Sequence, residues 1–182
     1  MKYKVLLAAA NVDLVITVFP QNKFSVPAIF GAFKFYIFVE IHNFRKMIQQ
    51  TEIILSGYKR GYHLITTLIE KKLPQLPEKG LLHILVRHTS AGITLNENAD
   101  PAVRGDFERF INKMIPENDP SYVHTYEGAD DMPAHLKSSV IGAEITIPIT
   151  NGRLNLGTWQ GIYFCEFRNY GGERKLVLTI YS

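Results

Sequence analysis

The chain has 182 residues, 46% hydrophobic and 20% charged, which is an ordinary balance for a soluble globular protein. Its single cysteine, Cys165, excludes an intramolecular disulfide framework and favours a reducing compartment, so we expect a cytoplasmic location. Residues 1–46 hold six Lys/Arg and two acidic residues, whereas the remainder holds 14 and 15. Because the main body has no basic excess, we expect no nucleic-acid partner.

Residues 1–46 differ in character from the rest of the chain. The basic start and apolar run of "MKYKVLLAAANVDLVITVF" suggest a secretory signal, but Asn11 and Asp13 interrupt the run. A second apolar stretch, "FSVPAIFGAFKFYIFV", is short for a bilayer span and contains Pro27 and Lys34. We interpret residues 1–46 as an extension of doubtful structure, either a targeting segment or sequence translated upstream of Met47. For residues 47–182 we expect a separate domain without membrane contact.

In the first half of this domain the sequence predicts strands and helices in alternation. "MIQQTEIIL" predicts a strand, "YHLITTLIEKKL" a helix with one apolar stripe, and "LLHILVR" a second strand. Asp100 followed by Pro101 predicts a helix start. That helix is expected to bury Val103, Phe107, Phe110, Ile111 and Met114 on one face.

The second half adds a short helix and a series of strands. The helix is expected from Met132 to Ile141, with its stripe on Met132, Leu136 and Val140. "EITIPI", "RLNLGT", "GIYFCEFR" and "ERKLVLTIY", separated by turns, predict a meander whose last strand is apolar on both faces. Strands gathered at the end with helices before them predict an α+β fold of stacked antiparallel or mixed sheets, with helices on one side.

Three histidines lie at element ends beside small or hydroxyl-bearing residues: His88 in "RHTS", His124 in "VHTY" and His135 in "PAHLKSS". Three neutral imidazoles from separate elements make a workable ligand set for zinc or a similar divalent ion, with one coordination position open. The spacing matches no metal motif, so three unrelated polar-loop histidines are the alternative interpretation.

Two further stretches are dense in polar groups. In "TLNENADP", Asn96 and Asn98 either support a turn or present acceptors near the histidines. In "LGTWQGIYFCEFR", Glu166 shares a strand face with apolar residues. It either pairs with Arg168, acts as a general acid or base, or orients a histidine. The sequence contains neither a phosphate-binding glycine loop before a helix nor a GxSxG elbow.

The blocks "RHTSAGITLNENADP", "HTYEGADDMPAHLKSS" and "NGRLNLGTWQGIYFCEFR", in this order and spacing, resemble the YjbQ family, often named secondary thiamine-phosphate synthase. The resemblance covers Met47 to Ser182. It implies an α+β sandwich that assembles as a homotrimer and has a histidine-lined pocket, here His88, His124 and His135. A divalent metal, zinc or magnesium, is the cofactor we expect there.

The resemblance implies an enzyme that joins a pyrimidine diphosphate to a thiazole phosphate. The alternatives are a metal-assisted hydrolase of a small phosphorylated or anionic metabolite, and a non-catalytic trimer that binds a ligand or metal. The catalytic residues we expect are His88, Glu166, Trp159 and Gln160, and the substrate-binding residues are Asn96, Asn98, Thr158 and Lys137.

Overall fold

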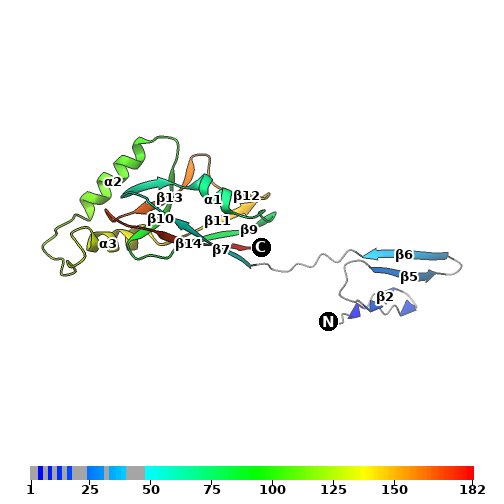
Figure 1. The fold of residues 1–182 in the computed structure, drawn as a ribbon. Coiled ribbons are helices and arrows are strands. Elements are labelled where there is room, and N and C mark those ends of the chain that lie inside the picture. Colours follow the sequence, from blue (N-terminus) through cyan, green and yellow to red (C-terminus); the bar gives the residue numbers. More distant parts are fainter. Residues whose placement is uncertain are drawn as a thin grey trace. The chain divides into compact units, whose positions relative to one another are not determined.

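The structure is a computed structural model that describes residues 48–182 and, in the N-terminal part, the backbone of six short strands. The chain divides into two compact units, residues 1–45 and 46–182 (Figure 1). In the first unit the strands form three antiparallel pairs: β1 (Lys4–Val5) with β4 (Ile16–Thr17), β2 (Ala8–Ala9) with β3 (Val12–Asp13), and β5 (Phe24–Phe30) with β6 (Phe33–Val39). The remaining residues up to 47 lie outside the described residues, so the origin of this extension stays a prediction.

The second unit contains two antiparallel sheets. The larger has the order β12-β11-β9-β14-β7, and the smaller has the order β10-β13-β8. The strands of both sheets are β7 (Ile48–Leu55), β8 (Gly61–Leu64), β9 (Lys79–Val86), β10 (Ala91–Glu97), β11 (Glu144–Thr150), β12 (Arg153–Leu154), β13 (Gln160–Glu166) and β14 (Arg174–Tyr181). A two-residue turn, Asn151–Gly152, joins β11 to β12, and both residues have the positive φ that this tight hairpin requires.

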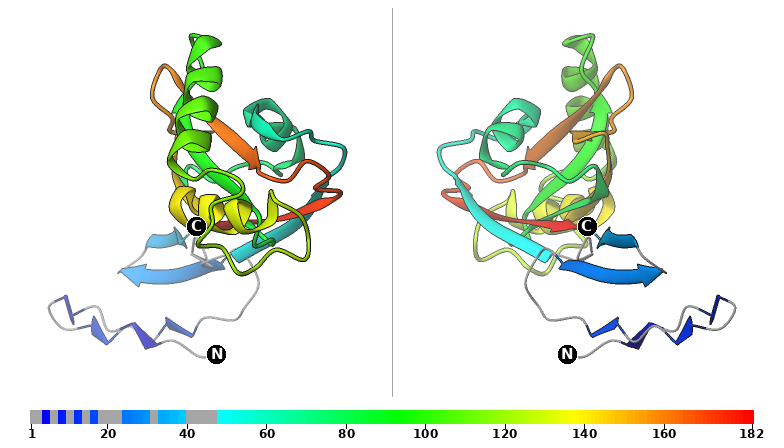
Figure 2. Two further views of the ribbon diagram at one scale, coloured as in Figure 1. Left: turned by 90° about the vertical axis from the view of Figure 1, so that its left-hand side faces the viewer. Right: turned by 90° about the vertical axis from the view of Figure 1, so that its right-hand side faces the viewer.

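The two sheets stack face to face, and the helices of residues 102–114 and 131–141 cover the smaller sheet on its other side (Figure 2). The short helix of residues 66–72 contributes Ile69 to the core between the sheets. Ile162 and Phe164 of β13 enter the core between the sheets, together with the inward residues of β7, β9, β11 and β14. Tyr163 and Cys165 of the same strand point the other way and pack with Ala134 of the last helix. The fold class predicted from the sequence, stacked sheets with helices on one side, is confirmed.

Three helices complete the domain: α1 (Thr66–Lys72), α2 (Ala102–Met114) and α3 (Asp131–Ile141). The expected start of α2 is supported, because Asp100 Oδ1 accepts a hydrogen bond from the Ala102 amide at 2.7 Å. The expected apolar faces are partly wrong. Phe110 and Met114 of α2 are exposed, as is Val140 of α3. The buried face of α3 instead carries Asp131, Pro133, Ala134, Lys137 and Ser138.

Four other expectations about strands are corrected. Residues 62–64, expected within the first helix, belong to strand β8, and α1 begins only at Thr66. Asn96 lies in a strand rather than in a turn, because Ala91–Glu97 pairs along its full length with β13. The last strands form no single meander, since β13 and β14 belong to different sheets. The strand covered on both faces is β13 rather than β14, whose Lys175 and Tyr181 are exposed.

Among the described residues, no helix is both long and apolar enough to cross a membrane. A cytoplasmic location stays a prediction.

Candidate functional site

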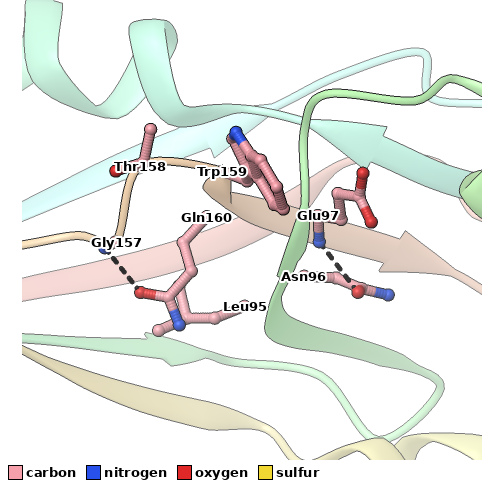
Figure 3. Close-up of a pocket in the computed structure, with 7 residues that line it drawn as sticks. All are labelled: Leu95, Asn96, Glu97, Gly157, Thr158, Trp159 and Gln160. Atoms are coloured by element: carbon pink, nitrogen blue, oxygen red, sulfur yellow. Dashed lines mark hydrogen bonds between the residues drawn. The ribbon is translucent and has the colours of Figure 1, made fainter.

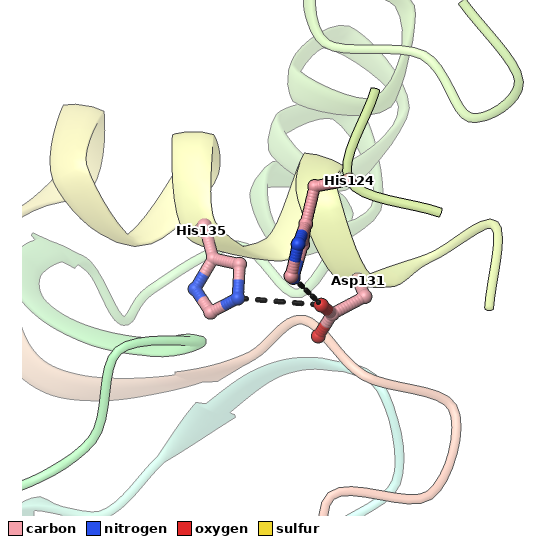
Figure 4. A group of neighbouring side chains, drawn as sticks. All are labelled: His124, Asp131 and His135. Atoms are coloured by element: carbon pink, nitrogen blue, oxygen red, sulfur yellow. Dashed lines mark ion pairs between the residues drawn. The ribbon is translucent and has the colours of Figure 1, made fainter. Parts of the chain in front are cut away.

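Helix α3 and the loop before it bring two histidines and a carboxylate together (Figure 4). Asp131 and His135 lie one turn apart on α3, so their side chains project from the same face. His124 reaches the same place from the preceding loop. Its Nε2 lies 2.8 Å from Asp131 Oδ2, and His135 Nε2 lies 3.4 Å from the same oxygen. One ligand atom from each of the three residues lies within 4.8 Å of the others.

Asp131 is almost fully buried, and its two oxygens have different surroundings. Oδ1 forms an ion pair with Arg168, whose Nε also binds Asp130 Oδ2 at 3.1 Å. Oδ2 is buried and forms no hydrogen bond within the part of the chain that the structure describes. The contact with His124 at 2.8 Å gives this oxygen a charged partner only while that imidazole is protonated. With neutral imidazoles the buried carboxylate oxygen has no counter-charge, so a cation between Oδ2 and the two rings would remove a penalty.

Backbone contacts fix the ring of His135. Its Nδ1 lies 3.0 Å from the carbonyl oxygen of Thr89. A carbonyl only accepts, so Nδ1 carries the proton and Nε2 presents its lone pair toward Asp131. A histidine whose other nitrogen donates to a backbone carbonyl is the usual arrangement for a metal ligand.

Sequence reasoning missed Asp131 as a functional residue. The signal was present: an aspartate four residues before a histidine on an expected helix places both on one face. The motif "GADDMPAH" was noted only for its histidine, because acidic pairs near helix starts usually serve the helix itself.

His88 directly precedes Thr89, whose carbonyl contacts His135. It is not among the three residues whose ligand atoms converge. It is exposed, and its Nδ1 lies 3.2 Å from the amide nitrogen of Ser90 and 3.1 Å from Ser90 Oγ. Partial burial lowers the pKa of His88, and the positive charge of Arg174 lowers it further. Both effects favour the neutral form of the His88 ring.

Glu166 lies behind His88 in a buried ion pair. Its oxygens bind Arg174 Nε at 2.7 Å and Arg174 Nη2 at 2.8 Å, and Arg174 Nη2 also lies 3.3 Å from Ser90 Oγ. The side chains of Glu166 and Arg174 are 0% and 3% exposed. The expected alternative, a pair with Arg168, is not formed, because Arg168 instead binds Asp130 and Asp131. The pair joins the end of β13 to the start of β14, so it links the two sheets.

The other expected site residues line a separate pocket (Figure 3). The pocket has a volume of about 560 Å³, and the indole of Trp159, 67% exposed, forms one wall. Two local hydrogen bonds orient its amides: Gly157 N donates to Gln160 Oε1 at 2.8 Å, and Glu97 N donates to Asn96 Oδ1 at 2.8 Å. Its lining residues are Leu95, Asn96, Glu97, Gly157, Thr158, Trp159 and Gln160. Asn98 follows directly, with its amide donating to the Trp159 carbonyl at 2.6 Å.

The two groups lie at opposite ends of one strand pair. In the β10–β13 register Ala91 is opposite Glu166, and Glu97 is opposite Gln160. A strand rises about 3.3 Å per residue, so the ends of β10 are about 20 Å apart. A single chain therefore does not bring the histidines and the Trp159 pocket into one cavity.

Lys137 lies apart from both groups. It is buried between α3 and α2, and its Nζ donates to Asn112 Oδ1 at 2.6 Å. Burial, aided by the nearby charge of Arg60, lowers the pKa of Lys137 to about 8. The substrate-binding role expected for it stays a prediction.

The lowered pKa of Lys137 predicts a pH-dependent stability. The folded protein releases this proton near pH 8, whereas the unfolded chain holds it up to about pH 10.4. Between these values the unfolded state binds more protons, so the contribution of Lys137 to stability rises with pH, by about 2 kcal/mol. Urea unfolding at pH 7.5 and 10 should show this rise in the wild type relative to Lys137→Met. Parallel pH dependence of the two proteins would contradict it.

The fold and the cluster together define a class: a small α+β protein of two stacked antiparallel sheets, with a His–Asp–His group at the start of a covering helix. The chain belongs to the YjbQ-like UPF0047 protein family, whose model matches residues 51–182. The family resemblance stated from the sequence is thereby confirmed.

Known relatives and solved structures agree with this assignment. The UPF0047 protein YjbQ of Salmonella typhimurium is 55% identical over 136 residues, which are 74% of this chain and 98% of the relative. That of Escherichia coli O157:H7 is 48% identical over the same shares. A crystal structure of a YbjQ-like protein of unknown function from Sulfolobus solfataricus matches with a TM-score of 0.66 and 25% identity, covering 76% of this chain and 99% of that one. The family's function is uncharacterised in these descriptions.

Proposed function

We propose that this protein binds a divalent metal ion, with zinc the first candidate, through His124, Asp131 and His135, and that it acts on a small anionic metabolite. The observation that carries the proposal is the buried Oδ2 of Asp131, which faces two imidazole nitrogens without a hydrogen bond. The proposal includes that the protein is an enzyme.

The donor set fits a transition metal better than magnesium. Imidazole nitrogens suit zinc and ferrous iron, whereas magnesium prefers oxygen ligands. With bonds of about 2.0–2.1 Å, neighbouring ligands of a tetrahedral ion are about 3.3 Å apart. The two contacts of Asp131 Oδ2, at 2.8 and 3.4 Å, are close to this value, and all three ligand atoms lie within 4.8 Å of one another. Three protein ligands leave one position open, and when bound such an ion polarises an oxygen of the substrate or activates water.

The charges around the cluster favour an anionic substrate. Arg168 pairs with the buried carboxylates of Asp130 and Asp131 and lies 3.7 Å from the exposed carboxylate of Glu127, and Arg174 balances Glu166. Of the two buried carboxylates at Arg168 one is left over, so a divalent ion makes the buried part of the site net positive. A phosphorylated or carboxylated small molecule is the complementary partner.

Thiamine-phosphate synthesis is a second candidate, supported by the Trp159 pocket. The exposed indole is a stacking platform for a flat heteroaromatic ring, and Asn96 and Gln160 offer amides to its edge. Since the pocket and the cluster lie at opposite ends of β10 and β13, a reaction that uses both needs residues from two copies of the chain. The homotrimer expected from the resemblance supplies such a neighbour.

The metal proposal is tested by comparing the wild type with Asp131→Asn. The amide keeps the oxygen that accepts from Arg168 but loses the ligand charge, so zinc affinity should fall about 100-fold. Elemental analysis gives the metal bound after purification, and competition with a chromophoric chelator gives the affinity. Asp106→Asn, an exposed carboxylate on α2, is the control and should keep the wild-type affinity. Equal zinc binding by Asp131→Asn and wild type would reject the centre.

The thiamine-phosphate candidate needs its own experiment. The wild type, loaded with zinc or magnesium, is incubated with the pyrimidine diphosphate and the thiazole phosphate, and thiamine phosphate is measured by fluorescence after oxidation. Trp159→Ala should reduce its formation at least tenfold through loss of stacking. If the metal-loaded wild type forms no product, this candidate fails while the metal centre stands.

A further inference from the structure

The turn after β9 contacts two histidines with opposite hydrogen-bonding groups. Its Thr89 carbonyl accepts from His135 Nδ1 at 3.0 Å, whereas its Ser90 amide donates to His88 Nδ1 at 3.2 Å. A backbone N–H can only donate and a carbonyl can only accept, so these contacts determine where each neutral ring holds its proton. His135 holds it on Nδ1, and His88 holds it on Nε2.

This difference decides what the outer nitrogen of each ring can do. A metal ligand needs a lone pair, and His135 Nε2 has one directed toward Asp131. The corresponding atom of His88 carries hydrogen and is a hydrogen-bond donor. The exposed ring is open to a ligand, and the positive charge of Arg168 is close enough to act on it.

We infer that His88 is not a metal ligand but donates a hydrogen bond from Nε2 to an anionic oxygen of the molecule bound at the His124–Asp131–His135 centre. The inference rests on the proposed metal centre and adds to it the residue that recognises the ligand. A phosphate or carboxylate oxygen is the acceptor whose charge gives such a bond its strength.

Buried groups hold His88 in this state. Ser90 is buried, and its Oγ lies between His88 Nδ1 and Arg174 Nη2. Arginine can only donate, so the hydroxyl accepts from Arg174 and sends its own hydrogen to His88 Nδ1. Glu166 fixes Arg174 by two hydrogen bonds. Glu166, predicted as a catalytic residue, acts in this arrangement as a positioning residue for His88.

The proton positions can be measured directly. In the zinc-free full-length protein labelled with ¹⁵N-histidine, long-range ¹⁵N–¹H correlation spectra distinguish a protonated from an unprotonated ring nitrogen. Single His→Ala variants assign the signals. We expect the proton of His88 on Nε2 and that of His135 on Nδ1. A proton on Nδ1 of His88 would overturn the inference.

A second measurement separates metal binding from anion binding. His88→Ala should bind zinc within threefold of the wild-type affinity, whereas His135→Ala should lose about 100-fold. Binding of inorganic phosphate to the zinc-loaded protein, measured by calorimetry, should weaken about tenfold in His88→Ala. His83→Ala, a strand histidine bonded to Thr146, is the control for both measurements.

The outcomes distinguish this inference from the proposed function. If zinc binding falls as far in His88→Ala as in His135→Ala, or phosphate binding is unchanged, the inference is wrong and the metal centre stands. If the wild type binds no zinc, the metal centre fails, and the inference fails with it.

Discussion

Replacement of Glu166 by glutamine is expected to lower the free energy of unfolding by about 3–5 kcal/mol. The change keeps the size of the side chain but leaves the Arg174 guanidinium, only 3% exposed, without its counter-charge. The pair is also tightly enclosed: a Cβ placed on Gly171 would lie 2.3 Å from Glu166 Oε2, so the carboxylate cannot move in that direction. Urea unfolding at pH 7 measures the loss.

A double variant and a surface pair test the cause. Glu166→Gln combined with Arg174→Met removes the uncompensated charge, so it should recover at least half of the lost stability. Asp106→Asn breaks the exposed pair with Arg109 on α2 and should change stability by about 0.5 kcal/mol or less. A loss below about 1 kcal/mol in Glu166→Gln would show that the buried pair does not hold the sheets together.

Truncation of Phe164 to alanine is the second large effect, again about 3–5 kcal/mol. The ring is fully buried at the centre of β13, in the core between the two sheets. It meets the Tyr58 ring edge to face, with centroids 5.4 Å apart. Because sheets on both sides fix its surroundings, the cavity left by the ring cannot collapse easily.

Chemical denaturation at a fixed pH compares this variant with two others. Phe164→Leu fills most of the space and should lose clearly less stability than Phe164→Ala. Tyr170→Ala removes an exposed ring from the turn between β13 and β14 and should be close to neutral. If Phe164→Ala were no worse than Tyr170→Ala, the position of the main core would be wrong.

Much of the fold follows from local patterns that need no tertiary information. The strands β9, β11 and β14 alternate or run apolar along most of their length, β7 ends in the apolar run Ile53–Leu55, and the Asn151–Gly152 turn dictates its hairpin. β10 was missed because "AGITLNE" ends in one amide and one carboxylate side chain, and its identity as a strand depends on pairing with β13. The buried face of α3 was missed because Asp131 and Lys137 occupy it.

The site shows the same division. The sequence by itself determined the family, the two-layered α+β character and the chemistry-bearing residues His88, His124 and His135, since residue types and motif spacing are local properties. Only the tertiary structure decided which of them converge. It added Asp131 to His124 and His135, paired Glu166 with Arg174 instead of Arg168, and placed Trp159 at the far end of the same strands. These outcomes depend on strand register, on burial and on which donor faces which acceptor, and contacts between distant segments fix all three.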